Sequence, residues 1–218
     1  MLEQILPPPV AVAESFGDLP DAKLFPEEEA IIARAVARRR REFASGRACA
    51  RAALAQLGEP PVPILRGPRD APQWPAGIAG SITHCAGYRA AAAARIAEVV
   101  SLGLDAEPDE ALPAGVLDVI SRPQERAQLA ALAAAHPDAA CWDRLLFCAK
   151  ESVYKTWFPL AQEWLGFDDA EIVIDVGGTF TARLLVPGPP VNGSPLTSLG
   201  GRWLAARGLL VTAIALPA

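Results

Sequence analysis

The order of helical and strand patterns along the chain constrains its fold more than any other feature. A helical pattern starts at Pro26, before three acidic residues that suit a helix start, and runs to Gly58 with a break expected at Ser45-Gly46. Strand patterns follow over 62–66, 78–84, 88–96 and 98–107. Helical patterns return over 113–120, 123–135 and 140–158, and strand patterns close the chain over 170–176, 179–186, 202–207 and 209–216. This doubled order predicts an α+β fold of pseudo-repeated architecture, although the two halves share no alignable sequence repeat.

The bulk properties exclude several classes of protein. The first residues lack the basic start and long apolar stretch of a signal peptide, and no run of about 18 apolar residues occurs, so a soluble cytoplasmic protein without a membrane partner is expected. The four cysteines form no C-x-x-C pair and are expected to be reduced thiols. The absence of G-x-S-x-G, G-x-x-x-x-G-K-[ST], G-x-G-x-x-G and H-E-x-x-H argues against the usual hydrolase, P-loop, dinucleotide and zincin classes.

Positive charge gathers in the first helical pattern, although the chain as a whole has a net charge of −5. Residues 34–51 hold seven arginines and one acid, Glu42. A basic helix of this kind is either a solvated face or a site for polyphosphates. Because the rest of the chain is acidic and only Phe43 is interleaved with the arginines, capture of one small anionic ligand is favoured over nonspecific nucleic-acid binding.

Two carboxylates leave the same face of one apolar strand pattern. Asp105 and Glu107 are two residues apart, and Pro108 ends the strand directly after them. Neighbouring carboxylates repel unless a cation lies between them, and such oxygen ligands suit Mg²⁺, which also binds phosphate oxygens. The alternative is an ordinary polar strand end.

Charged residues interrupt the apolar helix that is expected over 140–158. Glu151 and Lys155 are four residues apart on one face, and Lys150 is turned away from them. One alternative is a surface ion pair. However, apolar side chains cover most of the helix circumference. Because an unpaired buried charge costs roughly several kcal/mol, each charge needs either an ion-pair partner or a functional role.

These residues form two ordered motifs that resemble a known family. G-x-D-x-E lies at Gly103, Asp105 and Glu107, and F-x-x-K-E-S-x-x-K runs from Phe147 to Lys155. With the segments FASGRACARAALAQLG, WPAGIAGSITHCAGYRAA and GRWLAARGLLVTAIAL, they resemble the 4′-phosphopantetheinyl transferases of the larger, carrier-protein-activating type, in particular the actinobacterial, mycobacterial-type enzymes. The similarity covers nearly the whole chain.

The resemblance implies a fold and an activity. The fold is a pseudo-twofold pair of similar α/β subdomains, here 1–108 with the arginine-rich helices and 109–218 with the Lys-Glu helix, and the active site lies in the cleft between them. The activity is Mg²⁺-dependent transfer of the 4′-phosphopantetheine group from coenzyme A to a serine hydroxyl of an apo acyl or peptidyl carrier protein, which releases adenosine 3′,5′-bisphosphate. The expected partners are carriers of fatty acid, polyketide or nonribosomal peptide synthases, siderophore biosynthesis included, and a monomer is expected.

The resemblance also assigns roles to individual residues. Asp105, Glu107 and Glu151 would hold Mg²⁺, Glu151 would take the proton of the carrier serine directly or through water, and Lys155 would stabilise charge as the bond breaks. The expected coenzyme A residues are Arg39, Arg47, Arg66, Ser81, Thr83, His84, Asp105, Lys150 and Lys155. Arg66 departs from the pattern, because close relatives tend to have lysine there.

Two other functions stay open on the residues alone. A Mg²⁺-dependent hydrolase or phosphotransferase acting on diphosphates would use the same three carboxylates. A non-catalytic module that binds anions or nucleic acids would need only the arginines.

Overall fold

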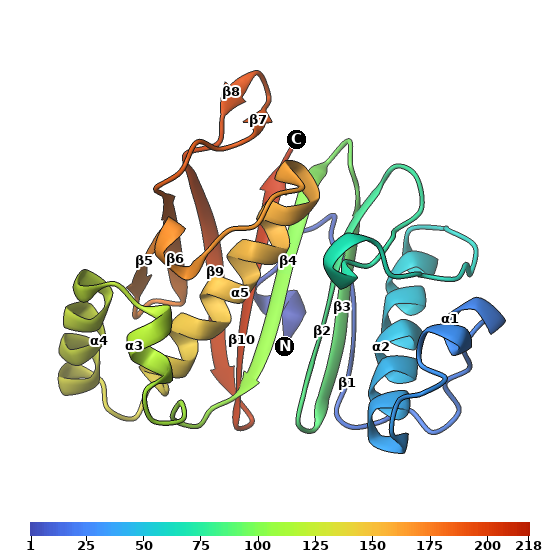
Figure 1. Cartoon of the computed structure of the whole chain (residues 1–218), viewed down its shortest axis with the longest axis horizontal. Coiled ribbons are helices and arrows are strands. Elements are labelled where there is room, and N and C mark those ends of the chain that lie inside the picture. Colours follow the sequence, from blue (N-terminus) through green and yellow to red (C-terminus); the bar gives the residue numbers. More distant parts are fainter.

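Two antiparallel sheets make up the structure, which is a computed structural model that describes residues 1–218 (Figure 1). The smaller sheet has the order β1-β3-β2 and consists of β1 (Ala11–Ser15), β2 (Ile78–Cys85) and β3 (Tyr88–Arg95). The larger sheet has the order β4-β10-β9-β6-β5 and consists of β4 (Val99–Pro108), β5 (Ala170–Asp175), β6 (Thr179–Leu184), β9 (Ser198–Ala206) and β10 (Leu209–Pro217). A separate hairpin pairs β7 (Pro190–Val191) with β8 (Ser194–Pro195).

One long helix packs on each sheet. The α-helices are α1 (Pro26–Ile31), α2 (Ala37–Gln56), α3 (Val116–Ile120), α4 (Pro123–Ala135) and α5 (Trp142–Ala161), and the short 3-10 helices are η1 (Leu2–Gln4), η2 (Pro68–Asp70) and η3 (Phe167–Asp169). α2 lies against β1 and β3, and α5 lies across β4 and β10 (Figure 1). The predicted mixture of helix and sheet is therefore confirmed. None of the helices combines the length and the apolar composition that a membrane span requires.

The break in the first helical pattern lies elsewhere than predicted. The helix that starts at Pro26 ends at Ile31, and α2 then runs without interruption through Ser45 and Gly46. Ser45 Oγ accepts a hydrogen bond from the Leu19 amide at 2.8 Å, and a Cβ at position 46 would lie 3.4 Å from Ile82 of β2. α2 is continuous at both residues, so the break predicted there is wrong.

All the predicted strands but one are confirmed, and the structure adds β1, β7 and β8 to them. Residues 62–66 form only an isolated bridge between Arg66 and Pro72 and no strand. The edge strand β1 was not predicted, because its five residues, Ala11–Ser15, follow a proline run and show too short an alternation.

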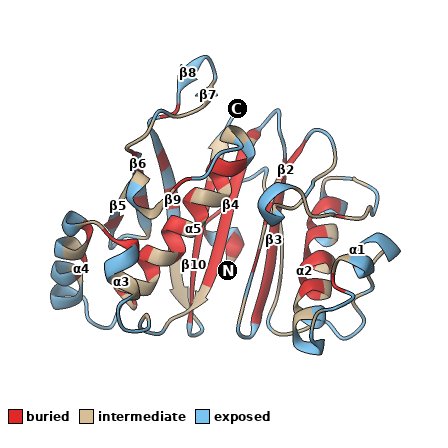
Figure 2. Ribbon diagram, in the orientation of Figure 1, coloured by how far each residue is buried: buried red, intermediate tan, exposed pale blue.

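The buried residues form three clusters, one under each long helix and one between the sheets (Figure 2). The cluster between the sheets brings Leu102, Leu104 and Ala106 of β4 against alternate alanines of β3. β3 is buried on both faces, since Ala90 to Ala94 have no exposed surface. Small side chains there let α2 and the larger sheet approach β3 from opposite sides.

Side chains rather than a strand ladder join the two sheets along β2 and β4. The two strands lie against each other but belong to different sheets. Ser81 Oγ accepts a hydrogen bond from the Leu104 amide at 3.0 Å, and Thr83 Oγ1 accepts one from the Ala106 amide at 3.1 Å. We call this contact the seam. β4, which precedes the expected boundary at residue 108, pairs with β10 in the larger sheet.

Candidate active site

Gly103 sets the position of α5 on β4. A Cβ built at this residue would lie 2.0 Å from the backbone oxygen of Ser152 and 2.2 Å from Thr156 Oγ1, so only glycine permits this approach. Ser101 Oγ donates to the Thr156 carbonyl at 2.7 Å, one helical turn beyond Ser152. The close packing places the acidic end of β4 beside the charged face of α5.

Asp105 and Lys155 form a mostly buried ion pair at this contact. Asp105 is 5% exposed, and its Oδ1 accepts hydrogen bonds from Lys155 Nζ at 2.7 Å and from Thr83 Oγ1 at 3.2 Å. Lys155 Nζ also donates to the Leu104 carbonyl at 3.0 Å. Burial acts to lower the pKa of Lys155, but the adjacent Asp105 carboxylate outweighs it and the net pKa is raised. Lys155 is therefore a cation held at the end of the seam.

Glu107 and Glu151 flank this pair. Glu107 accepts a hydrogen bond from Arg144 Nη1 at 3.0 Å, whereas Glu151 projects from the middle of α5. Burial, and next the charge of Asp105, raise the pKa of both glutamates. The three carboxylates therefore lie close enough to repel one another.

The three expected metal ligands do not form a preassembled ligand set. No group of three or more His, Cys, Asp or Glu side chains in the chain is arranged to hold a metal ion. Asp105 turns one oxygen to Lys155, and Glu107 turns to Arg144, so the convergence expected from the sequence is not seen here. The donor chemistry nevertheless fits a hard cation, because Asp105 Oδ2 is buried without a hydrogen-bond partner among repelling carboxylates.

A second cluster of predicted residues lines one cavity beside α2. Arg39, Arg47, Arg66 and His84 share this cavity, which has a volume of about 160 Å³ and which we call the arginine cavity. Arg47 is buried, its Nε donates to the Ile64 carbonyl at 2.8 Å, and burial lowers its pKa to about 10. The guanidinium carbons of Arg47 and Arg66 lie 4.3 Å and 5.6 Å from the centre of the Phe43 ring. The ring and the carbonyl thus orient two cations toward one small space.

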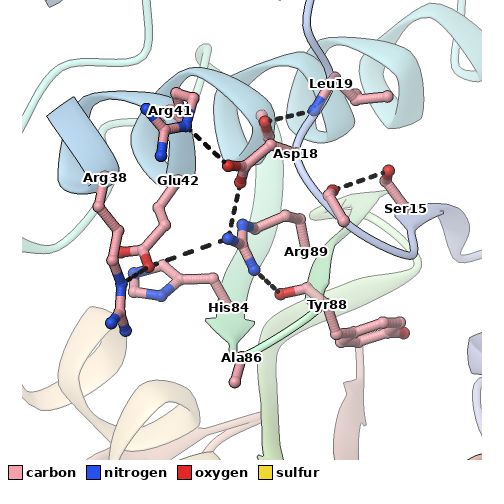
Figure 3. Close-up of polar contacts among 12 residues, drawn as sticks. Ser15, Asp18, Leu19, Arg38, Arg41, Glu42, His84, Ala86, Tyr88 and Arg89 are labelled. Carbon is pink, nitrogen blue, oxygen red and sulfur yellow. Dashed lines mark hydrogen bonds and ion pairs between the residues drawn. The ribbon is translucent and has the colours of Figure 1, made fainter.

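His84 acts as an acceptor within this cluster. Arg39 Nη1 lies 2.6 Å from His84 Nε2, so this nitrogen carries no proton, and burial and the Arg39 charge lower the pKa of His84. Acidic residues neutralise the arginines behind it, as Figure 3 shows. Asp18 pairs with Arg89 at 2.7 Å and with Arg41 at 3.1 Å, and Glu42 pairs with Arg38 at 2.9 Å.

Lys150 does not join either cluster. Its Nζ lies 2.9 Å from Glu125 Oε1 and donates to the carbonyls of Phe167 and Ala170 at 2.6 Å and 3.0 Å. The side chain is 3% exposed, and burial lowers its pKa against the effect of Glu125. Its three donors are all used within the protein, so its ammonium connects α5 to α4 and β5.

Ser81 and Thr83 are also engaged elsewhere, since both hydroxyls accept the β4 amides of the seam. They contribute to the site by position, and Thr83 does so further through its hydrogen bond to Asp105.

A second cavity adjoins Glu151, and sequence reasoning missed it. Its volume is about 250 Å³, and Tyr154, Trp164 and Arg69 line it with Glu151. The Tyr154 and Trp164 rings lie 5.0 Å apart. Tyr154 is one of the side chains that cover the circumference of α5, and an aromatic three residues after Glu151 on one helix face was a usable signal. We call this space the aromatic cavity.

Comparison with known sequences identifies the class of protein that this arrangement serves. Residues 27–94 match the 4′-phosphopantetheinyl transferase N-terminal domain, and residues 101–201 match the 4′-phosphopantetheinyl transferase superfamily. The chain belongs to the 4′-phosphopantetheinyl transferases, enzymes that transfer the phosphopantetheine group to carrier proteins. The hydrolase and the non-catalytic binding module are thereby set aside.

Individual relatives agree with this assignment. The chain is 56% identical to the 4′-phosphopantetheinyl transferase Svp of Streptomyces mobaraensis, with 100% of this chain and 90% of the relative aligned. It is 52% identical to the 4′-phosphopantetheinyl transferase PptT of Mycobacterium tuberculosis, over 95% of this chain and 92% of the relative. It is also 33% identical to enterobactin synthase component D of Salmonella typhi, over 69% of this chain and 61% of the relative. The resemblance to the mycobacterial-type enzymes is confirmed.

Proposed function

We propose that the chain uses coenzyme A as the donor and transfers its 4′-phosphopantetheine group to a serine hydroxyl of an apo acyl or peptidyl carrier protein in a Mg²⁺-dependent reaction. One observation carries this proposal. The arginine cavity meets the cluster of Asp105, Glu107, Glu151 and Lys155 at the seam. There, Thr83 of β2 donates a hydrogen bond to Asp105 of β4 at 3.2 Å, and the next residue of β2 is His84. A site for a nucleotide phosphate thus adjoins a site for phosphoryl chemistry.

The two cavities suit the two ends of coenzyme A. Arg39, Arg47 and Arg66 supply fixed cations for the 3′-phosphate, and His84 adds a polar group beside them. The aromatic cavity has mostly apolar walls, which suit the uncharged pantetheine arm. The diphosphate lies between these two ends of the molecule, toward Lys155.

Glu151 and Lys155 would act on the reacting atoms. The serine oxygen forms a bond to the phosphorus that carries the pantetheine arm, and the bond from that phosphorus to the bridging oxygen breaks. The electron pair leaves with adenosine 3′,5′-bisphosphate, and the serine proton passes to the Glu151 carboxylate. The Lys155 cation stabilises the charge that develops on the phosphates.

The metal assignment stays with the same carboxylates. Asp105, Glu107 and Glu151 would hold Mg²⁺, and the unpartnered Asp105 Oδ2 supports this choice. Bound Mg²⁺ supplies positive charge that neutralises the diphosphate.

The finer architecture and the partners belong to the same proposal. A pseudo-twofold pair of subdomains, 1–108 and 109–218, is supported by the long helix that packs on each antiparallel sheet, with β4 of the first half contributed to the larger sheet. The carriers would be those of fatty acid, polyketide or nonribosomal peptide synthases, and the name of the Salmonella relative supports a siderophore pathway. We propose a monomer, because one chain contains both cavities, and the cytoplasmic location predicted from the sequence stays part of the proposal.

A mass measurement tests the proposal. The protein is incubated with coenzyme A, Mg²⁺ and an apo carrier protein, and the carrier is weighed by mass spectrometry. A gain equal to one phosphopantetheine group is expected, and it should be lost with Glu151→Gln and with a chelator. Release of free phosphopantetheine without any change of the carrier would contradict the proposal.

A further inference from the structure

Arg144 connects the start of α5 to the end of β4 through all three nitrogens of its guanidinium. Nη1 donates to Glu107 Oε2 at 3.0 Å, and Nε and Nη2 donate to the Glu110 and Ala111 carbonyls, each at 3.0 Å. The Arg144 and Glu107 side chains are 17% and 22% exposed, so water screens this ion pair less than an exposed pair. One rigid planar group therefore holds a carboxylate together with two backbone carbonyls that follow it in the chain.

The segment that follows β4 is fastened to α5 by two further hydrogen bonds. Asp109 Oδ1 accepts a hydrogen bond from the Cys141 amide at 2.8 Å. Asp143 Oδ2 accepts one from the Leu112 amide at 3.0 Å. Because these bonds anchor both ends of the segment without the guanidinium, support of the segment does not by itself explain why Arg144 also binds a carboxylate of the candidate site.

The two carboxylates of β4 show the same division of their oxygens. Asp105 Oδ1 accepts hydrogen bonds from Lys155 and Thr83, whereas Asp105 Oδ2 is buried without a partner. Glu107 Oε2 accepts a hydrogen bond from Arg144, and no hydrogen bond within the protein engages Glu107 Oε1. In each residue a cation fixes one oxygen and leaves the other for a ligand. Carboxylates that bind metal ions are commonly held in orientation by such outer hydrogen-bond partners.

We propose that Arg144 is a positioning residue for the divalent cation, because it holds the Glu107 carboxylate by Oε2 and leaves Oε1 for the ion that Asp105 Oδ2 also binds. This inference rests on the proposed function, which assigns Mg²⁺ to these carboxylates. Arg144 acts through Glu107 and needs no contact with coenzyme A or with the ion. A guanidinium suits this role better than an ammonium, because its planar fork reaches a side chain and two carbonyls at once.

Matched substitutions separate this role from support of the segment after β4. Arg144→Met removes the charge and all donors but keeps a long side chain that favours a helix. Arg144→Lys keeps the charge and loses the planar fork. Asp143→Ala removes one of the bonds that fasten the segment and leaves the Arg144 guanidinium in place. Arg183→Ala is the control for loss of an arginine–glutamate pair, because Arg183 of β6 pairs with Glu171 of β5.

Binding of Mg²⁺ is measured by calorimetry on the protein saturated with coenzyme A, without carrier protein, so that no transfer occurs. Arg144→Met is expected to raise the Kd for Mg²⁺ about tenfold to a hundredfold, the range for losing an outer partner of a metal ligand. Arg144→Lys should raise this Kd less, and both controls should keep the wild-type Kd. In the transfer assay, the Mg²⁺ concentration that gives half the maximal rate should rise by the same factor in Arg144→Met, with a much smaller change in kcat at saturating Mg²⁺.

A double-mutant cycle shows whether Arg144 acts through Glu107. Glu107→Gln alone should weaken Mg²⁺ binding, because it removes one charged ligand. Adding Arg144→Met to Glu107→Gln should cause no further loss, since the carboxylate that the guanidinium holds is already gone. A full additional loss in the double variant would contradict the proposed route.

Three other results would overturn the inference. An unchanged Kd for Mg²⁺ in Arg144→Met would show that the guanidinium does not orient a ligand, and a lower Kd would show that it competes with the ion. Equal losses in Arg144→Met and Asp143→Ala would assign the effect to the segment after β4. If Arg144→Met does not fold, Arg144→Lys decides, because a wild-type Kd in that variant would remove the need for the fork.

The proposed function fails in a different way. Mg²⁺-dependent transfer by the wild type and by Arg183→Ala, together with an unchanged Kd in Arg144→Met, would reject the inference and leave the proposed function standing. A wild type that transfers the group without binding Mg²⁺ would reject the metal assignment, and the inference with it.

Discussion

Neutralising Asp105 and neutralising Glu151 should change the stability of the free protein in opposite directions. Asp105→Asn keeps the shape of the side chain but removes the charge that Lys155 contacts at 2.7 Å. Breaking a buried ion pair by removing one partner costs about 3–5 kcal/mol. The Lys155 side chain is 28% exposed and keeps its bond to the Leu104 carbonyl, so the lower end, about 3 kcal/mol, is expected. In a chain of this size that loss lowers Tm by roughly 6–12 °C.

Glu151→Gln should instead stabilise the free protein. The pKa of Glu151 is raised by burial and then by Asp105, so the folded state disfavours the ionised form. When the pKa of a carboxyl group is higher in the folded state than in the unfolded state, the protein loses stability as the pH rises through the unfolded-state pKa. The loss is complete above the folded-state pKa. The amide removes this penalty, so the free energy of unfolding should rise at neutral pH.

Denaturant unfolding of both variants checks this pair of predictions. The measurement is made without coenzyme A and with a chelator, at about pH 7.5 and at about pH 5. The advantage of Glu151→Gln should shrink at the lower pH, because the wild-type carboxyl then approaches its protonated form. Equal stability of Asp105→Asn and wild type, or a loss of stability in Glu151→Gln at neutral pH, would refute the reasoning.

Three other substitutions probe single contacts. Lys150→Met should lower the free energy of unfolding by about 3 kcal/mol, because Glu125 is left buried without its cationic partner. The KM for coenzyme A should stay near the wild-type value, and a large rise in KM would place Lys150 at the phosphates. Gly103→Ala should cost about 3 kcal/mol or more, because the added methyl meets the α5 backbone, and calorimetric unfolding would reveal it. Asp70→Asn frees Arg66 of its acid and should lower KM for coenzyme A about two- to threefold in the transfer assay; an unchanged KM would contradict competition between Asp70 and the ligand.

The periodic segments could be predicted from the sequence, whereas the use of individual glycines could not. α4 and α5 begin and end near their predicted limits, because their apolar positions repeat at helical spacing over many residues. Gly46 and Gly103 carry no such signal. Glycine can interrupt an element or permit close packing, and only the position of Ser152 of α5 shows that Gly103 does the second.

The candidate site divides in the same way. The motifs found Asp105, Glu151 and Lys155, and the charge imbalance found Arg39 and Arg47 of the arginine cavity, because each signal is local in sequence. The direction in which Lys150 points depends on Glu125 of another helix, and the role of Ser81 depends on an amide of β4. Contacts between distant segments are set by tertiary packing and leave no pattern in one sequence.

In the proposed complex, the seam decides how far apart the two ends of coenzyme A are held. No ladder fixes the register of β2 against β4, so the alignment of the two strands depends on the hydroxyls of Ser81 and Thr83. A shift along this line would move His84 relative to Asp105 while every strand pairing within each sheet stayed intact. In the proposed complex, two hydroxyl oxygens therefore set the distance between the nucleotide end and the reacting end of the cosubstrate.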